Sequence, residues 1–180
     1  ALDLRKTLVV GISATALFDM NESDQIFRDM FDTDRDVAIN RYRDYMLAHE
    51  DLPLSPGTGF PLVKALLALN SHLEAGEMSP LVEVVVMSRN SPETGLRVLN
   101  TIRHMKLDIT RSAFTAGESV VDYLDAFDVD LFLTTNVGDA QQVIDSRQCA
   151  AAVVKLPPKE AAQIPEGQVR IAFDGDAVLF

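Results

Sequence analysis

Leu8-Val9-Val10-Gly11-Ile12-Ser13 is a continuous apolar run that ends in a hydroxyl side chain. Polar and apolar residues do not alternate in it, and this pattern predicts a β-strand that is buried on both faces. Strands of this kind belong to parallel sheets, which helices cover on each side. The run therefore sets the expectation of an α/β fold.

The sequence beyond this run alternates between strand patterns and helix patterns, as a parallel sheet with covering helices requires. Further strands are predicted at Val82–Met87, Ile109–Phe114, Val129–Thr134 and Ala150–Val154. Helices are predicted at Phe60–Leu73, Pro92–His104, Ser119–Phe127 and Ala140–Arg147. The predicted fold class is α/β, a parallel sheet flanked by helices.

The segment between the first strand and the loop at Pro53 has a different pattern. From Asn21 to about Glu50 its apolar residues recur at helix-like intervals, which predicts two amphipathic helices. We expect residues 20–52 to form a small helical insert after the first strand.

The end of the chain departs from this alternation. Three prolines, at positions 157, 158 and 165, lie among charged residues, which predicts a linker over residues 158–168. We therefore divide the chain into a first domain, residues 1–157, and a segment of a second domain, residues 169–180.

Composition restricts the class of partner. The chain carries 27 Asp and Glu against 16 Lys and Arg, a formal net charge of -11, which argues against binding a nucleic acid polymer. A small phosphorylated substrate stays possible because a metal ion can hold it locally. The single cysteine, Cys149, the lack of a long apolar stretch and the lack of a signal peptide favour a cytoplasmic protein without a membrane partner.

Asp174 and Asp176 follow an apolar run, and an apolar strand that enters Asp-x-Asp is typical of haloacid-dehalogenase-type (HAD) phosphatases. Two carboxylates and Mg²⁺ supply what phosphoryl transfer needs: a nucleophile, a proton donor and charge neutralisation. Asp174 is the candidate nucleophile, Asp176 the candidate acid and base, and both are candidate Mg²⁺ ligands. The local alternative is a β-hairpin in which Gly175 and one aspartate form a two-residue turn.

Ser88 and Asn90 follow the predicted strand Val82–Met87, and loops after the carboxyl ends of parallel strands often bind phosphate. They are candidate substrate-binding residues. The alternative, helix capping, is favoured because Ser91-Pro92 fits the N-cap and first position of the next helix unaided. Asp139 is similarly a candidate metal ligand or the N-cap of the helix that follows it.

Three segments together resemble the cytosolic type I 5'-nucleotidases. They are Ala16-Leu17-Phe18-Asp19-Met20, the stretch from Ser55-Pro56-Gly57 to Phe60-Pro61-Leu62-Val63-Lys64-Ala65-Leu66, and Val169-Arg170-Ile171-Ala172-Phe173-Asp174-Gly175-Asp176-Ala177-Val178-Leu179-Phe180. The resemblance runs through nearly the whole chain and favours the phosphatase interpretation of Asp174 and Asp176 over the hairpin. It implies a Mg²⁺-dependent, HAD-like hydrolase of nucleoside 5'-monophosphates whose chain continues past residue 180.

Residues 1–157 themselves follow a HAD-like order of strands and helices but lack its catalytic acids. Ile12-Ser13-Ala14 stands where Asp-x-Asp is expected, and Thr134-Thr135-Asn136 stands where metal-binding acids are expected. We expect a degenerate HAD-like domain, followed by a catalytic domain that opens at Asp174 and is truncated here.

Three hypotheses follow. In the favoured one, the chain is the first part of a 5'-nucleotidase, and its partner is the missing C-terminal segment or a second copy. In the second, it is a non-catalytic nucleotide-binding or dimerisation module. In the third, Asp174 and Asp176 fold back beside Ser88 and complete a site.

Overall fold

The protein was analysed as a computed structural model, which describes residues 4–31, 33–74, 76, 79–155, 168–169 and 171–172. Among these residues, no helix has the length and apolar content that a membrane span requires. The predicted linker, apart from Gln168, lies outside the described residues, and so do Asp174 and Asp176.

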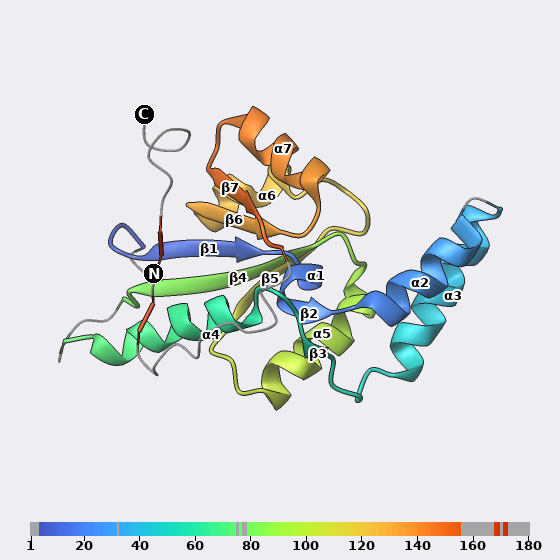
Figure 1. The fold of residues 1–180 in the computed structure, drawn as a ribbon, viewed down its shortest axis with the longest axis horizontal. Helices are drawn as coiled ribbons and strands as arrows, with labels where there is room; N and C mark the ends of the chain where they lie inside the picture. Colours follow the sequence, from blue (N-terminus) through green and yellow to red (C-terminus); the bar gives the residue numbers. More distant parts are fainter. Residues whose placement is uncertain are drawn as a thin grey trace.

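A five-stranded parallel sheet forms the centre of the molecule (Figure 1). Its strands are β1 (Leu8–Ile12), β4 (Val82–Ser88), β5 (Arg111–Phe114), β6 (Leu131–Thr134) and β7 (Ala150–Val153). Their order in the sheet is β5-β4-β1-β6-β7, so the first strand lies in the middle. The predicted α/β class, a HAD-like parallel sheet flanked by helices, is confirmed.

The central strand is buried on both faces, as its apolar run predicts. Val10 pairs with Val84 of β4 and with Leu131 of β6. Because successive side chains of a strand point to opposite faces, Val9 and Val10 belong to two different core clusters. One cluster lies on each face of the sheet, and helices close both.

Helices cover both faces of the sheet (Figure 1). The first core cluster includes side chains of α4 (Phe60–Ala68) and α5 (Pro92–His104). The second includes Leu124 of α6 (Val121–Leu124) and Val143 of α7 (Val137–Ser146). A short α1 (Ala14–Leu17) turns the chain directly after β1.

The helical insert leaves the sheet domain through a small antiparallel hairpin. Strand β2 (Phe18–Asp19) leads into α2 (Asn21–Phe31) and α3 (Arg35–Ala48), and the chain returns through β3 (Ser55–Pro56). The two helices pack against each other and project away from the sheet (Figure 1). The two predicted helices between Asn21 and Glu50 are therefore present, whereas the hairpin that carries them was not predicted.

Several predicted boundaries are wrong by a few residues. The helix predicted at Phe60–Leu73 ends at Ala68 and continues as the 3-10 turn η1 (Leu69–His72). The helix predicted at Ser119–Phe127 is reduced to α6 and the 3-10 turn η2 (Asp125–Phe127). In both places the hydrogen bonding tightens in the last turn, as is common at helix ends.

Candidate functional site

A cavity of about 310 Å³ lies at the carboxyl ends of three neighbouring strands, β1, β4 and β6. This edge is where parallel α/β sheets usually hold ligands. The lining residues are Ser13, Ala14, Thr15, Asp24, Met87, Ser88, Arg89, Asn90, Val120, Phe132, Thr135, Asn136 and Asp139. We call this cavity the cleft.

Hydroxyl groups occupy the end of β1, where a HAD phosphatase would carry acids. The Ser13 Oγ accepts a hydrogen bond from the Ala16 backbone N–H at 3.2 Å and so caps α1. It also lies 3.2 Å from the Thr15 Oγ1, which lies 3.0 Å from the Thr135 Oγ1. A chain of hydroxyls thus connects the ends of β1 and β6.

The predicted binding residues Ser88 and Asn90 lie in the cleft beside each other. The Ser88 Oγ accepts a hydrogen bond from the Asn90 backbone N–H at 3.2 Å. Ser88 does not cap the next helix, because Ser91 accepts from the Thr94 N–H and caps α5 itself. The structure therefore leaves both side chains at the cleft, while their role in binding stays a prediction.

Asn90 connects the sheet domain to the insert. Its Oδ1 accepts a hydrogen bond from the Tyr42 hydroxyl of α3 at 3.2 Å. Burial, reinforced by the negative charge of Asp24, raises the pKa of the Tyr42 phenol, so the hydroxyl stays protonated and donates. The Asn90 Nδ2 is buried and has no hydrogen-bond partner among the described residues.

Asp139 pairs with an arginine instead of capping its helix. Its Oδ1 lies 2.6 Å from the Arg89 Nη2, which joins the ends of β4 and α7 across the cleft. The N-cap of α7 is Asn136, whose Oδ1 accepts from the Asp139 backbone N–H at 3.1 Å. The predicted helix start at Ala140 and the capping role of Asp139 are therefore wrong, because Asn136 starts the helix three residues earlier.

Asp24 reaches the cleft from α2 of the insert. Burial raises the pKa of its carboxyl above the ordinary value of 3.8; Arg28 opposes this shift, and Asp19 adds to it. Asp24 could not be predicted from the sequence as a cleft residue, because the direction in which the insert folds depends on tertiary contacts.

The cleft does not fit Mg²⁺ as its described residues stand. Mg²⁺ is usually bound in octahedral geometry by one or two ionised carboxylates together with waters and substrate phosphates. Here one acid, Asp139, is neutralised by Arg89, and Asp24 lies where burial disfavours its charge. No group of three or more His, Cys, Asp or Glu side chains among the described residues is arranged to hold a metal ion. The cleft can donate and accept hydrogen bonds, but it offers no nucleophile–metal pair.

Comparisons with known proteins agree along the whole chain. A family model described as 5'-nucleotidase matches residues 1–180. The chain is 30% identical to human "Cytosolic 5'-nucleotidase 1B" over 178 residues, which is 98% of this chain and 28% of that relative. The chain thus spans a little over a quarter of the length of the relative it matches.

Proposed function

Because this chain belongs to the 5'-nucleotidase family, we propose that it is part of an enzyme that hydrolyses nucleoside 5'-monophosphates to nucleoside and phosphate. The observation that carries this proposal is the extent of the family match, which includes Phe173-Asp174-Gly175-Asp176 as well as the described domain. The name of the relative, a cytosolic protein, supports a cytoplasmic location for this one.

The proposed chemistry belongs to Asp174 and Asp176. The Asp174 carboxylate attacks phosphorus, the bond from phosphorus to the 5' oxygen breaks, and Asp176 gives its proton to that oxygen. Water then attacks the aspartyl-phosphate, Asp176 takes a proton from the water, and phosphate leaves Asp174. Both carboxylates would hold Mg²⁺, which offsets the repulsion between the carboxylate and the phosphate.

The described domain has a supporting role in this proposal. Its cleft presents Ser13 and Thr135 at the strand ends where HAD phosphatases carry acids, so no aspartyl-phosphate can form at these two positions. We therefore assign the chemistry to the segment that opens at Asp174 and the described residues to a non-catalytic HAD-like domain.

A second candidate function is a non-catalytic nucleotide-binding module. The observation that favours it is the polar lining of the cleft. The hydroxyls of Ser13 and Ser88 can form hydrogen bonds with a ligand, and the Asn90 Nδ2 can donate one after a small rearrangement. Under this alternative the protein binds nucleoside monophosphates without turning them over.

Phosphate release from a panel of nucleoside monophosphates, with and without Mg²⁺, tests the proposal. The assay compares the 180-residue chain with a protein extended to the length of its relatives. The key variant is Asp174→Asn, and the matched control is Asp108→Asn, an exposed loop carboxylate without a described hydrogen bond. We expect Mg²⁺-dependent turnover in the extended protein, a loss of at least about a thousandfold in Asp174→Asn, and no change in the control.

Two further results separate the hypotheses. If the 180-residue chain releases phosphate, and both Asp174→Asn and Ser88→Ala abolish that release, a site built from both ends of the chain would be favoured. Nucleotide binding by an extended protein that releases no phosphate would contradict the proposal and favour the binding module.

A further inference from the structure

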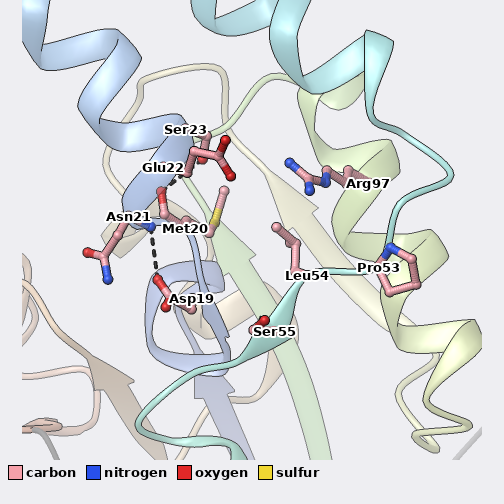
Figure 2. Close-up of a pocket in the computed structure, with 9 residues that line it drawn as sticks. All are labelled: Asp19, Met20, Asn21, Glu22, Ser23, Pro53, Leu54, Ser55 and Arg97. Carbon is pink, nitrogen blue, oxygen red and sulfur yellow. Dashed lines mark hydrogen bonds between the residues drawn. The ribbon is translucent and has the colours of Figure 1, made fainter.

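A second cavity, of about 370 Å³, lies where the chain passes between the sheet domain and the insert (Figure 2). Residues 19–23 form the outgoing crossing, residues 53–55 form the returning crossing, and Arg97 of α5 closes one side. We call it the crossing cavity. Its volume is at the lower end of the range for small-molecule sites.

Arg97 is a buried cation whose charge is only partly compensated. The residue is 8% exposed, its Nε donates to the Leu52 carbonyl at 3.0 Å, and its guanidinium lies 5.7 Å from the centre of the Tyr45 ring. Among the described residues, no carboxylate lies within 4.0 Å of it. Its Nη atoms are not among the buried polar atoms without a partner, so they are open to the cavity and can donate hydrogen bonds to an anion there.

The opposite wall supplies hydrogen-bond acceptors. The Asp19 Oδ1 accepts from the Asn21 backbone N–H at 3.0 Å, which leaves its second oxygen for another donor. Glu22 has no hydrogen bond or ion pair to a described residue, and Figure 2 shows its carboxylate and the Arg97 guanidinium pointing toward each other across the cavity. The Ser55 hydroxyl lies at the same opening.

These two walls select for a ligand with two kinds of group. Asp19 and Glu22 would repel a bare anion, whereas a neutral polyol would leave Arg97 without a partner. Carboxylates in nucleotide-binding folds accept hydrogen bonds from sugar hydroxyls, and arginine binds phosphate and carboxylate groups through paired N–H donors.

We propose that the crossing cavity binds a small anionic polyol, with its phosphate or carboxylate group on Arg97 and its hydroxyl groups on Asp19 and Glu22. The site is separate from the cleft, since the two cavities share no lining residue. Ser23 lines the crossing cavity and the next residue, Asp24, lines the cleft, so the bound ligand would contact the segment that positions Asp24.

Isothermal titration calorimetry of the unmodified protein with four probes tests this site: ribose 5-phosphate, gluconate, ribose and inorganic phosphate. We expect ribose 5-phosphate or gluconate to bind at least about tenfold more tightly than ribose or phosphate. A preference between the two tighter probes identifies the anionic group as phosphate or carboxylate. Equal weak binding of all four probes, or no binding, would overturn the proposal.

Two variants test the assignment of the residues. Arg97→Gln should weaken the tighter probe at least about tenfold, while Arg103→Gln, an exposed arginine of the same helix, should not. In Glu22→Gln, the replaced side chain makes no hydrogen bond or ion pair to a described residue, so the substitution breaks no described contact. It should weaken the polyol anion and strengthen inorganic phosphate, because it removes a hydrogen-bond acceptor and a repulsive charge together.

The Glu22→Gln variant also covers the case in which Arg97→Gln fails to fold through loss of the Leu52 contact. Its unfolding midpoint without ligand should fall only slightly, because Glu22 is one of two acids in the first turn of α2. A fall as large as that of Arg97→Gln would show that Glu22 pairs directly with Arg97 and would overturn the proposal, as would tighter phosphate binding without any change for the polyol anion.

Discussion

Asp24 is a carboxylate that the insert places at the cleft, in surroundings that disfavour its charge. Burial raises its pKa, so the folded state holds the proton more strongly than the unfolded state does. A carboxyl with a raised folded-state pKa lowers stability once pH exceeds that pKa, and it has no such effect below its unfolded value near 3.8.

Asp24→Asn should therefore stabilise the protein at neutral pH. We expect its free energy of unfolding at pH 7 to exceed that of the unmodified protein, and the difference to shrink as pH falls from 7 toward 4. Urea denaturation at several pH values measures this. Asp108→Asn serves as the control and should change the unfolding free energy by less than about 0.5 kcal/mol at pH 7. A variant less stable than the unmodified protein at pH 7 would contradict the assigned cause.

Cleft residues that lie at strand ends could be predicted from the sequence. Cleft residues that other elements contribute could not. Ser88 ends a strongly apolar strand and Asn90 lies two residues beyond it, so their place at the edge of the sheet follows from the strand pattern. Asp24 lines the same cleft from α2, and Tyr42 of α3 donates to Asn90 there, but nothing in their helical spacing indicates which way the insert folds. The pairing of Arg89 with Asp139 likewise needs the contact between β4 and α7.

Helix α7 shows how one capping side chain sets an element boundary. Helical periodicity predicts a start at Ala140, whereas the Asn136 side chain bonds the Asp139 N–H and begins the helix at Val137. Capping chemistry decides such boundaries, because the first turn lacks internal hydrogen-bond partners for its N–H groups. The hairpin of β2 and β3 was missed for a related reason, since two-residue strands carry no periodic signal.

Replacing this cap tests the boundary directly. Asn136→Ala should lower the free energy of unfolding by about 1 kcal/mol, because the Asp139 backbone N–H loses its acceptor. Asn136→Ser retains a capping oxygen and should recover most of that loss. Urea denaturation with far-UV circular dichroism measures both variants. Equal stability of the alanine and serine variants would indicate that the cap adds nothing.

The arrangement of the whole molecule depends on how the returning chain is fixed against the outgoing one. After β3, the Gly57 N–H donates to the Leu17 carbonyl at 2.9 Å, and the Gly59 N–H donates to the Ala16 carbonyl at 2.7 Å. These bonds hold the two crossings together at the base of the insert. The crossing cavity, which both crossings line, and the place of Asp24 at the cleft therefore depend on them.

Gly57 has no room for a side chain at this junction. A Cβ there would lie 2.7 Å from the Ala16 carbonyl oxygen and 2.8 Å from backbone atoms of Phe18. Because these neighbours are backbone atoms, the clash can be relieved only by separating the two crossings. Gly57→Ala should therefore lower the unfolding free energy by about 1–3 kcal/mol.

The same substitution should also disturb both cavities, since it displaces the base of the insert as a unit. We expect weaker binding of the polyol anion in the crossing cavity together with the loss of stability, measured by calorimetry and urea denaturation on the same samples. Ser55→Ala, two residues earlier and exposed, is the control for stability and should leave it within about 0.5 kcal/mol. If Gly57→Ala were as stable as this control, the two crossings would not be fixed by their close approach. The insert would then be held mainly by α3 against α5 and by the Tyr42–Asn90 hydrogen bond.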